Sequence, residues 1–215
     1  MNGTNAKQKV HSGTQCPPNE RWAPLAPKAP FDNDDGTARF GEITFARTFG
    51  TTGSITSGFW RVYDGAPGVR FNEKTRSVKI EYPSVSGDET AVVIDGTATI
   101  TVQSTGETFR IGPGSIISTP EDLKTTWEID APYLKTFWVI WRGSQPVKDA
   151  PQALKINHIN DNPDEWTPYS RSNGKGGELV SGELYMIRDT GSSGFMISGI
   201  AQSFSLHLNW TYADV

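Results

Sequence analysis

The stretch ETAVVIDGTATITV, residues 89–102, decides how this chain is expected to fold. Over residues 97–102 three threonines fall on one side of an extended strand, and an alanine, an isoleucine and a valine fall on the other. Such alternation is typical of a β-strand with one buried face. The next segments, QSTGE and TFRIGPGSII, predict a turn and a returning strand. This part of the chain is therefore expected to form an antiparallel sheet.

The same β pattern extends on both sides of this stretch. Twenty-two glycines and fourteen prolines punctuate the 215 residues, which favours many short strands over long helices. No segment of about ten residues shows a helical period. Short strands spaced by about 8–12 residues are typical of a sandwich or a barrel. We therefore predict an all-β fold with one complete barrel over residues 39–142.

The chain contains an internal repeat. Residues 41–58, GEITFARTFGTTGSITSG, align without a gap on residues 182–199, GELYMIRDTGSSGFMISG, at an offset of 141. Seven of the eighteen positions are identical, and a Trp-x-Pro motif recurs as Trp22–Pro24 and Trp166–Pro168. Repetition at a fixed spacing predicts a repeated structural unit.

The repeat sets the expected domain organisation. Residues 1–38 are predicted to be a proline-rich arm, residues 143–163 a linker with ALKINHI as a candidate strand, and residues 164–215 a partial second unit. Unfinished sheets leave unpaired edges that favour association. The extra strands are expected either to join the first barrel within the chain or to pair with a second copy in a homodimer. A third alternative is that the chain is a fragment of a two-barrel protein.

Composition excludes several partners. A net charge of −4 offers no basic field for nucleic acid or for anionic lipid. No apolar run approaches the roughly 20 residues that a membrane-spanning helix needs. The N-terminus lacks the apolar stretch of a signal peptide, and Cys16 is the single cysteine, so a disulfide framework is excluded. The expected setting is the cytoplasm.

Motifs for metals and phosphates are weak. DNDDG lacks the first ligand and the flanking helices of a calcium loop, and SNGKGGE lacks the strand and hydroxyl residue of a phosphate loop. The three histidines, His11, His158 and His207, are far apart and predict no ligand pair.

The central segments of the chain carry a resemblance to a known family. Glu89, six residues and then Gly96, followed by GPGSIISTPEDLKTTWEI, resemble the two signature stretches of the cupin superfamily, whose members are small jelly-roll barrels. The resemblance implies a cupin-like jelly-roll β-barrel, and tandem cupins would account for the partial second unit.

A narrower resemblance concerns the segment before the last strand of the unit. Pro120, Lys124, Trp127 and Glu128 match the pattern of ureidoglycine-aminohydrolase-like cupins, whereas Asp122 and Thr125 depart from it.

The usual metal ligands of cupins are missing. Metal-binding cupins carry His-x-His shortly before the glutamate and another histidine in the second stretch. This chain has Tyr82, Pro83, Ser84 and Val85 in the first window and Thr125 at the later position, so only Glu89 remains. One carboxylate cannot hold a divalent ion, which needs about three protein ligands. We therefore predict a barrel without a metal or another cofactor.

The candidate site is the barrel interior. Glu89 is the candidate catalytic residue. The candidate ligand-binding residues are Trp60, Tyr82, Thr125, Trp127 and Trp138. These aromatic side chains either form the core or provide walls for a flat organic molecule. Burial would raise the pKa of Glu89 and suit it to general acid–base chemistry, unless Arg70 or Lys79 reaches its carboxylate.

Three functional hypotheses follow. The first is a cofactor-free isomerase, lyase or cyclase that acts on a small organic molecule. The second is a binding or sensing module that uses the same pocket without chemistry. The third is a ligandless, dimeric structural cupin.

Overall fold

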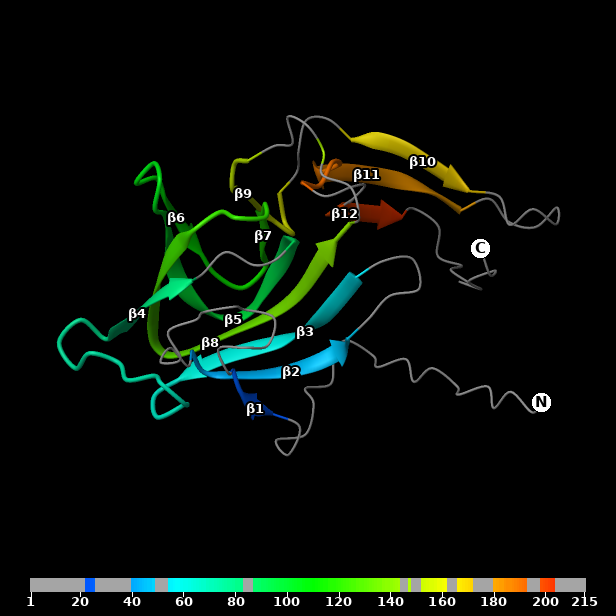
Figure 1. Ribbon diagram of the computed structural model, residues 1–215. Coiled ribbons are helices and arrows are strands. Elements are labelled where there is room, and N and C mark those ends of the chain that lie inside the picture. The colour runs from blue at the N-terminus through cyan, green and yellow to red at the C-terminus, as the bar shows by residue number, and fades with distance from the viewer. Residues whose placement is uncertain are drawn as a thin grey trace, which may run out of the picture.

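The computed structural model describes residues 22–25, 40–48, 54–82, 87–143, 147, 152–161, 166–171, 180–192 and 198–203. Within these ranges every regular element is a β-strand (Figure 1), which confirms the all-β prediction. No described segment is a helix that could cross a membrane. Cys16, His11, His207 and residues 83–86 lie outside the described residues.

The strands are β1 (Ala23–Pro24), β2 (Glu42–Arg47), β3 (Ser54–Tyr63), β4 (Ser77–Tyr82), β5 (Asp88–Val102), β6 (Thr108–Ile111), β7 (Ser115–Thr119), β8 (Thr125–Arg142), β9 (Lys155–His158), β10 (Thr167–Arg171), β11 (Val180–Arg188) and β12 (Ser198–Ser203).

Nine of these strands form one antiparallel sheet that folds into two layers. One layer has the order β1-β2-β3-β8-β5-β7-β9, and β4 and β6 extend the other layer from β8 and β5. The later half of β8 pairs with β3, and its earlier half, residues 125–130, pairs with β4. β5 and β8 therefore contribute to both layers, as expected for a jelly-roll barrel.

β5 changes layer near Gly96. The pairing of β5 with β8 has register shifts between Val93 and Asp95 and again between Gly96 and Ala98. Gly96 has φ of 81°, a left-handed conformation that favours glycine. A Cβ atom there would stand 1.9 Å from the carbonyl oxygen of Tyr133. The glycine lets β5 bend while it stays in contact with β8.

The core lies between the two layers and follows the alternation of the strands. In β5 the even-numbered residues 98–102 are buried and the residues between them are half-buried, as the sequence predicts. β8 has the same pattern along both halves. The core includes Trp60, Val62, Ile80, Tyr82, Val93, Ile100, Ile111, Ile117, Trp127, Ile129, Leu134, Trp138 and Ile140.

The repeat appears as two hairpins with the same register. β2 and β3 pair Glu42 with Arg61, and β11 and β12 pair Glu183 with Gln202. Both hairpins have a register shift at the same place, between residues 45 and 47 and between residues 186 and 188. The Trp-x-Pro segments also add a strand at the same position of each hairpin, β1 on β2 and β10 on β11. The second copy forms a separate sheet with the order β10-β11-β12.

Two segments outside the predicted barrel contact it. Trp22 and Leu25 of the predicted arm are buried, and β1 between them pairs with β2. β9 forms within the stretch predicted as a linker and pairs with β7. The sheet built around the barrel therefore extends to residue 158.

Candidate functional site

Tyr82 and Glu89 form a buried pair at the end of β4 and the start of β5. The Tyr82 hydroxyl donates to the carboxylate of Glu89, at 3.3 Å from Oε1 and 3.2 Å from Oε2. Glu89 is 5% exposed and Tyr82 is 8% exposed. Tyr82 stands at the first position of the window where a metal-binding cupin would carry histidines, and this residue contacts Glu89.

Burial dominates the electrostatics of the pair. It raises the pKa of Glu89 to about 7, and the hydrogen bond from Tyr82 acts in the opposite direction. Burial, followed by the nearby Glu89 charge, also raises the pKa of Tyr82 well above its usual value. Arg70 and Lys79 are both exposed, and neither is among the causes that act on Glu89. Glu89 therefore lies in a buried environment and is not paired with Arg70 or Lys79.

Three aromatic rings pack together beside this pair. The ring centroids of Trp60 and Tyr82 are 5.7 Å apart, those of Trp60 and Trp127 are 5.7 Å apart, and those of Tyr82 and Trp127 are 5.4 Å apart. Separations of this size are typical of favourable aromatic pairs. The Trp60 indole donates to the carbonyl of Phe40 at 2.6 Å, which fixes one ring of the cluster. The Tyr82–Glu89 pair therefore lies in a dense aromatic environment.

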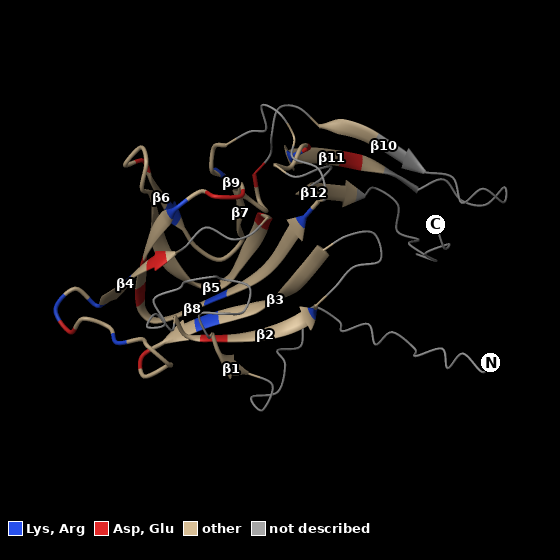
Figure 2. Cartoon of the chain, viewed as in Figure 1, with Lys and Arg blue, Asp and Glu red and all other residues tan. Residues whose placement is uncertain are grey.

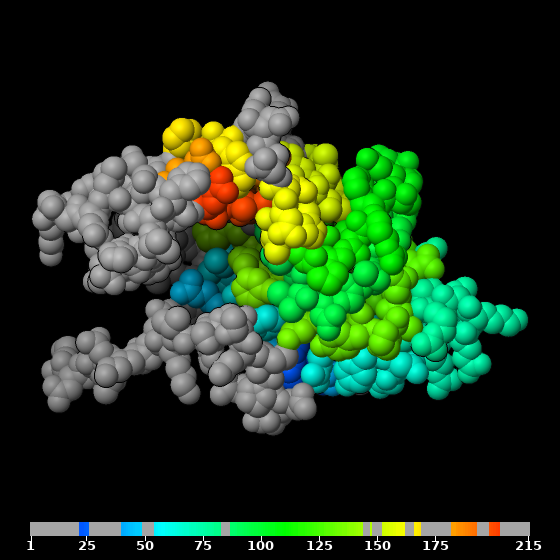
Figure 3. Space-filling model, turned by 180° about the vertical axis from the view of Figure 1, so that it is seen from behind, coloured from blue at the N-terminus to red at the C-terminus, as the bar shows by residue number. Residues whose placement is uncertain are grey.

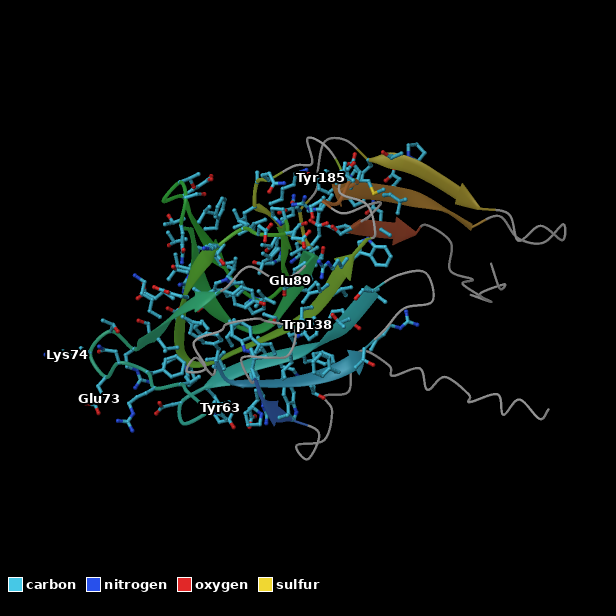
Figure 4. The ribbon with its side chains drawn as sticks, viewed as in Figure 1. Tyr63, Glu73, Lys74, Glu89, Trp138 and Tyr185 are labelled. Atoms are coloured by element: carbon cyan, nitrogen blue, oxygen red, sulfur yellow. The ribbon has the colours of Figure 1, made fainter. Side chains whose placement is uncertain are left out.

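The remaining predicted site residues differ in their placement. Thr125 is buried directly across from Tyr82 in the β4–β8 pairing, and its hydroxyl accepts from the Trp127 indole at 3.1 Å. Trp138 is also buried, but its ring contacts Phe45 edge-on at 5.7 Å. Figure 4 shows Glu89 and Trp138 among the central strands. The structure thus brings together the predicted residues except Trp138, whose ring contact lies outside the aromatic cluster.

The residues at the cupin ligand positions do not fit a divalent cation. One is a phenol that donates to the neighbouring carboxylate, one is a threonine bonded to an indole, and only Glu89 is a carboxylate. No cluster of three or more histidine, cysteine or acidic residues occurs among the described residues. A protein metal site needs about three such ligands.

The arrangement can hold and move a proton. A carboxyl group with a pKa near 7 exists in both protonation states at neutral pH, which is what a general acid or base requires. The Tyr82 hydroxyl donates to the charged form and so steadies the carboxylate after proton loss.

Two buried charged residues were missed by the sequence analysis. Asp88 and Arg188 are 0% and 1% exposed. Arg188 of β11 bonds to Ser118 of β7, and Asp88 of β5 accepts from Ser192, so both lie where the second sheet meets the barrel. Arg188 was visible only as one of the identities in the repeat, and no sequence signal connected it with Asp88. Elsewhere the described charges are dispersed along strands and loops in the view of Figure 2.

Comparison with known proteins identifies the fold. Residues 79–137 match the family model of the EutQ-like cupin domain. No curated protein gives a significant match. A protein of unknown function from Pseudomonas syringae pv. tomato is similar, with a TM-score of 0.53, 14% identity and coverage of 83% of this chain. This chain spans 64% of that protein's length.

Two further solved structures are similar over about half of this chain. The EutQ protein of Clostridium difficile has a TM-score of 0.34 and 17% identity over 46% of this chain and 60% of that chain. A mutant of oxalate decarboxylase from Bacillus subtilis has a TM-score of 0.35 and 18% identity over 47% of this chain and 25% of that chain. The predicted cupin fold is confirmed by the family model and by the all-β architecture. The ureidoglycine-aminohydrolase-like resemblance and the tandem arrangement stay predictions.

Proposed function

We propose that this cupin-fold protein binds a small organic molecule inside its barrel and moves a proton on it without a metal, with Glu89 as the general acid or base. The reaction class is that of an isomerase, a lyase or a cyclase. The observation that carries the proposal is the buried Tyr82–Glu89 pair, whose carboxyl group has a pKa of about 7.

The surroundings of the pair favour a flat, largely apolar ligand. Trp60 and Trp127 pack against Tyr82, and aromatic faces of this kind stack well on planar molecules. Thr125 supplies a hydroxyl on the neighbouring strand for orienting a polar group. In this proposal the two indoles hold the ring system of the ligand and Glu89 exchanges a proton with an acidic carbon or a heteroatom.

The competing candidate is a binding or sensing module. The same aromatic cluster supports it, because ligand binding requires only the walls and not a titrating carboxyl group. The two candidates differ in whether the bound molecule exchanges hydrogen with solvent.

Deuterium incorporation tests the catalytic proposal. The wild-type protein is incubated in D2O with a panel of planar ketones and unsaturated acids, and exchange at the carbon next to the carbonyl is followed by proton NMR. The wild type and the Glu81→Gln control, which changes an exposed carboxyl of β4, are expected to exchange at equal rates. Glu89→Gln is expected to lose exchange by a factor of about 10²–10⁴.

The outcomes separate the candidates. Exchange that is undiminished in Glu89→Gln contradicts the role of Glu89. Thermal stabilisation by a compound that exchanges no hydrogen supports the binding module instead. Absence of both binding and exchange across the panel favours the ligandless scaffold.

We also propose that the second sheet begins a second cupin unit and provides the contact of a homodimer. Its hairpin repeats the register of β2 and β3, and no other strand pairs with the outer edge of β12 within the described residues. Edge strands are usually protected by charges or proline. Each of the other edge strands has at least one such residue, whereas β12, with the sequence SGIAQS, has none. A second copy of β12 is therefore a suitable partner for this edge.

A further inference from the structure

A buried polar cluster joins the second sheet to the barrel. We call it the seam cluster and define it by Asp88 of β5, Ser118 of β7, Arg188 of β11 and Ser192. The Arg188 guanidinium donates from Nε to the Ser118 hydroxyl at 2.6 Å and from Nη2 to the carbonyls of Ser118 and Ala153 at 3.4 and 3.2 Å. Figure 3 shows β11 and β12, in orange and red, beside the yellow segment that includes β9.

Asp88 is held from two sides. Its Oδ2 accepts from the backbone N–H of Ser192 at 2.6 Å, and its Oδ1 accepts from the backbone N–H of Glu121 at 3.2 Å. Burial lowers the pKa of Arg188, and the negative charge of Asp88 acts in the opposite direction. A buried guanidinium is tolerated only where it has acceptors and a counter-charge, and the seam cluster supplies both.

The seam cluster lies in a region that also contains unpaired buried polar atoms. Among the residues that the structure describes, three buried polar atoms have no hydrogen-bond partner: Thr90 Oγ1, Trp141 Nε1 and Ser198 Oγ. By register each is opposite a cluster residue, because Thr90 pairs with Ser118, Trp141 with Asp88 and Ser198 with Arg188. Unpaired buried groups weaken an interface. The bonds of Arg188 therefore contribute to keeping the second sheet in place, together with those from Lys155 to Ile187 and from Asn157 to Tyr185.

Residues of the seam cluster are direct sequence neighbours of the Glu89 site on the same strands, but on the opposite face of the sheet. Asp88 and Glu89 are consecutive in β5, and successive side chains of a strand point to opposite faces. Ser118 and Thr119 are likewise consecutive in β7, and Thr119 is paired with Glu89. Arg188 therefore binds β7 at Ser118, next to Thr119, the residue paired with Glu89.

The repeat provides an internal comparison. Arg47 occupies the position of Arg188 in the first hairpin, each opposite a serine just after the register shift. Arg47 is exposed, whereas Arg188 is buried. The same residue at the same point of the same local structure thus has a buried polar contact only where the second sheet meets the barrel.

We propose that Arg188 is a positioning residue for the Glu89 site. It acts through its hydrogen bonds to Ser118 of β7, the strand that pairs with β5 at Glu89 and Thr90. When Arg188 is lost, the start of β5 loosens and water enters around Glu89. The effect of Arg188 on catalysis rests on the proposed function, whereas its effect on the environment of Glu89 does not. The positional effect can be measured without any substrate.

The titration of Glu89 reports its environment directly. Carbon-13 NMR of glutamate carboxyl groups, assigned with Glu89→Gln, gives the midpoint in each variant. Arg188→Met is expected to move the midpoint downward by about one pH unit or more, because hydration favours the charged form. Arg188→Lys, which keeps the charge but not the planar fork, is expected to shift it less. Arg47→Met is the matched control and should leave the midpoint unchanged.

The positions paired with Glu89 carry no charged group that could cause a downward shift of its titration midpoint. Glu89 is opposite Thr119 of β7 and Ile140 of β8, and Tyr82 of β4 bonds to it. Within its own strand the adjacent charge is Asp88, which Arg188→Met leaves in place. Removing a positive charge alone would move the midpoint upward, so a downward shift identifies loosening rather than a change of charge.

A second variant covers the case in which Arg188→Met does not fold. Ser118→Ala removes the 2.6 Å acceptor of Arg188 while it retains the guanidinium and Asp88. It is expected to shift the Glu89 midpoint in the same direction by a smaller amount. A folded Ser118→Ala or Arg188→Met protein with the wild-type midpoint overturns the proposal, even if its melting temperature falls. If the midpoint moves but the wild type exchanges no hydrogen, the positioning role stands and the catalytic proposal fails.

Discussion

Gly58 and Gly199 lie at equivalent positions of two hairpins, and neither position has room for a side chain. An added Cβ would stand 2.1 Å from the carbonyl oxygen of Thr44 at the first and 2.2 Å from that of Tyr185 at the second. Backbone atoms cannot move aside as the end of a flexible side chain can. The identity of these two glycines in the repeat is thus explained by a close approach of neighbouring strands.

Alanine at either glycine is expected to destabilise the protein. Gly58→Ala also meets the Trp138 ring at 2.9 Å, so it should cost about 1–3 kcal/mol and alter the fluorescence of the indoles. Gly199→Ala should destabilise the second sheet by a similar amount. Gly112→Ala is the control, because its new Cβ meets only Thr97 Cγ2 at an ordinary 3.5 Å. Chemical unfolding curves measure all three, and equal stability of Gly58→Ala and the wild type would contradict the contact.

The stability of the protein should fall as the pH rises through the range in which Glu89 titrates. The folded-state pKa of Glu89 is about 7 and its ordinary value is 4.5, so the folded state keeps a proton that the unfolded chain releases between these values. Stability from this group is therefore lost from about pH 4.5 to 7, by about 3 kcal/mol in all.

Glu89→Gln removes this pH dependence because it cannot ionise. It is expected to be more stable than the wild type at pH 8 and similar to it at pH 4.5, whereas Glu81→Gln should follow the wild type throughout. Urea unfolding at several pH values measures the difference. A parallel pH dependence in Glu89→Gln and the wild type would show that another group is responsible.

Tyr82→Phe should raise the Glu89 pKa further. The Tyr82 hydroxyl stabilises the charged carboxylate, and its hydrogen bond is what counteracts burial. Without it the midpoint of Glu89 in carbon-13 NMR is expected to move upward. A midpoint that stays in place or falls would mean that water takes over the role of the phenol.

Ala201→Lys tests the proposed contact between two copies of β12. The new charge lies on an exposed position of the unprotected edge strand, where it should prevent pairing with a second copy. Light scattering is expected to find a dimer for the wild type and a monomer for this variant. Thr108→Lys, on the β6 edge that already carries Arg110, is the control and should remain dimeric. A monomeric wild type would reject the homodimer.

The strands could be predicted because their signals are local. The alternation of residues 97–102 and the turn residues around them determine β5, β6 and β7 without reference to distant parts of the chain. The repeat was equally visible, and the structure gives it one register in both copies. Tyr82 and Glu89 were identified as candidates because the cupin resemblance aligned them with the site.

The contacts of the seam cluster could not be predicted from sequence. Ser118 and Arg188 are 70 residues apart, and Asp88 and Ser192 are 104 residues apart. No periodicity relates such positions, and a lone arginine near the end of a strand is ordinarily a solvated residue. The hydrogen bond between Tyr82 and Glu89 joins β4 and β5, two strands that do not pair with each other, so strand alternation does not predict it either.

The passage of β5 and β8 through both layers ties the two layers into one cooperative unit. A layer whose strands were its own could open while the other stayed folded, but here opening either one breaks the pairing of β5 with β8. Amide protons of β5 and β8 in the two layers should therefore exchange with solvent through the same rare global event. Partial unfolding is then confined to elements outside this pair, such as β10–β12.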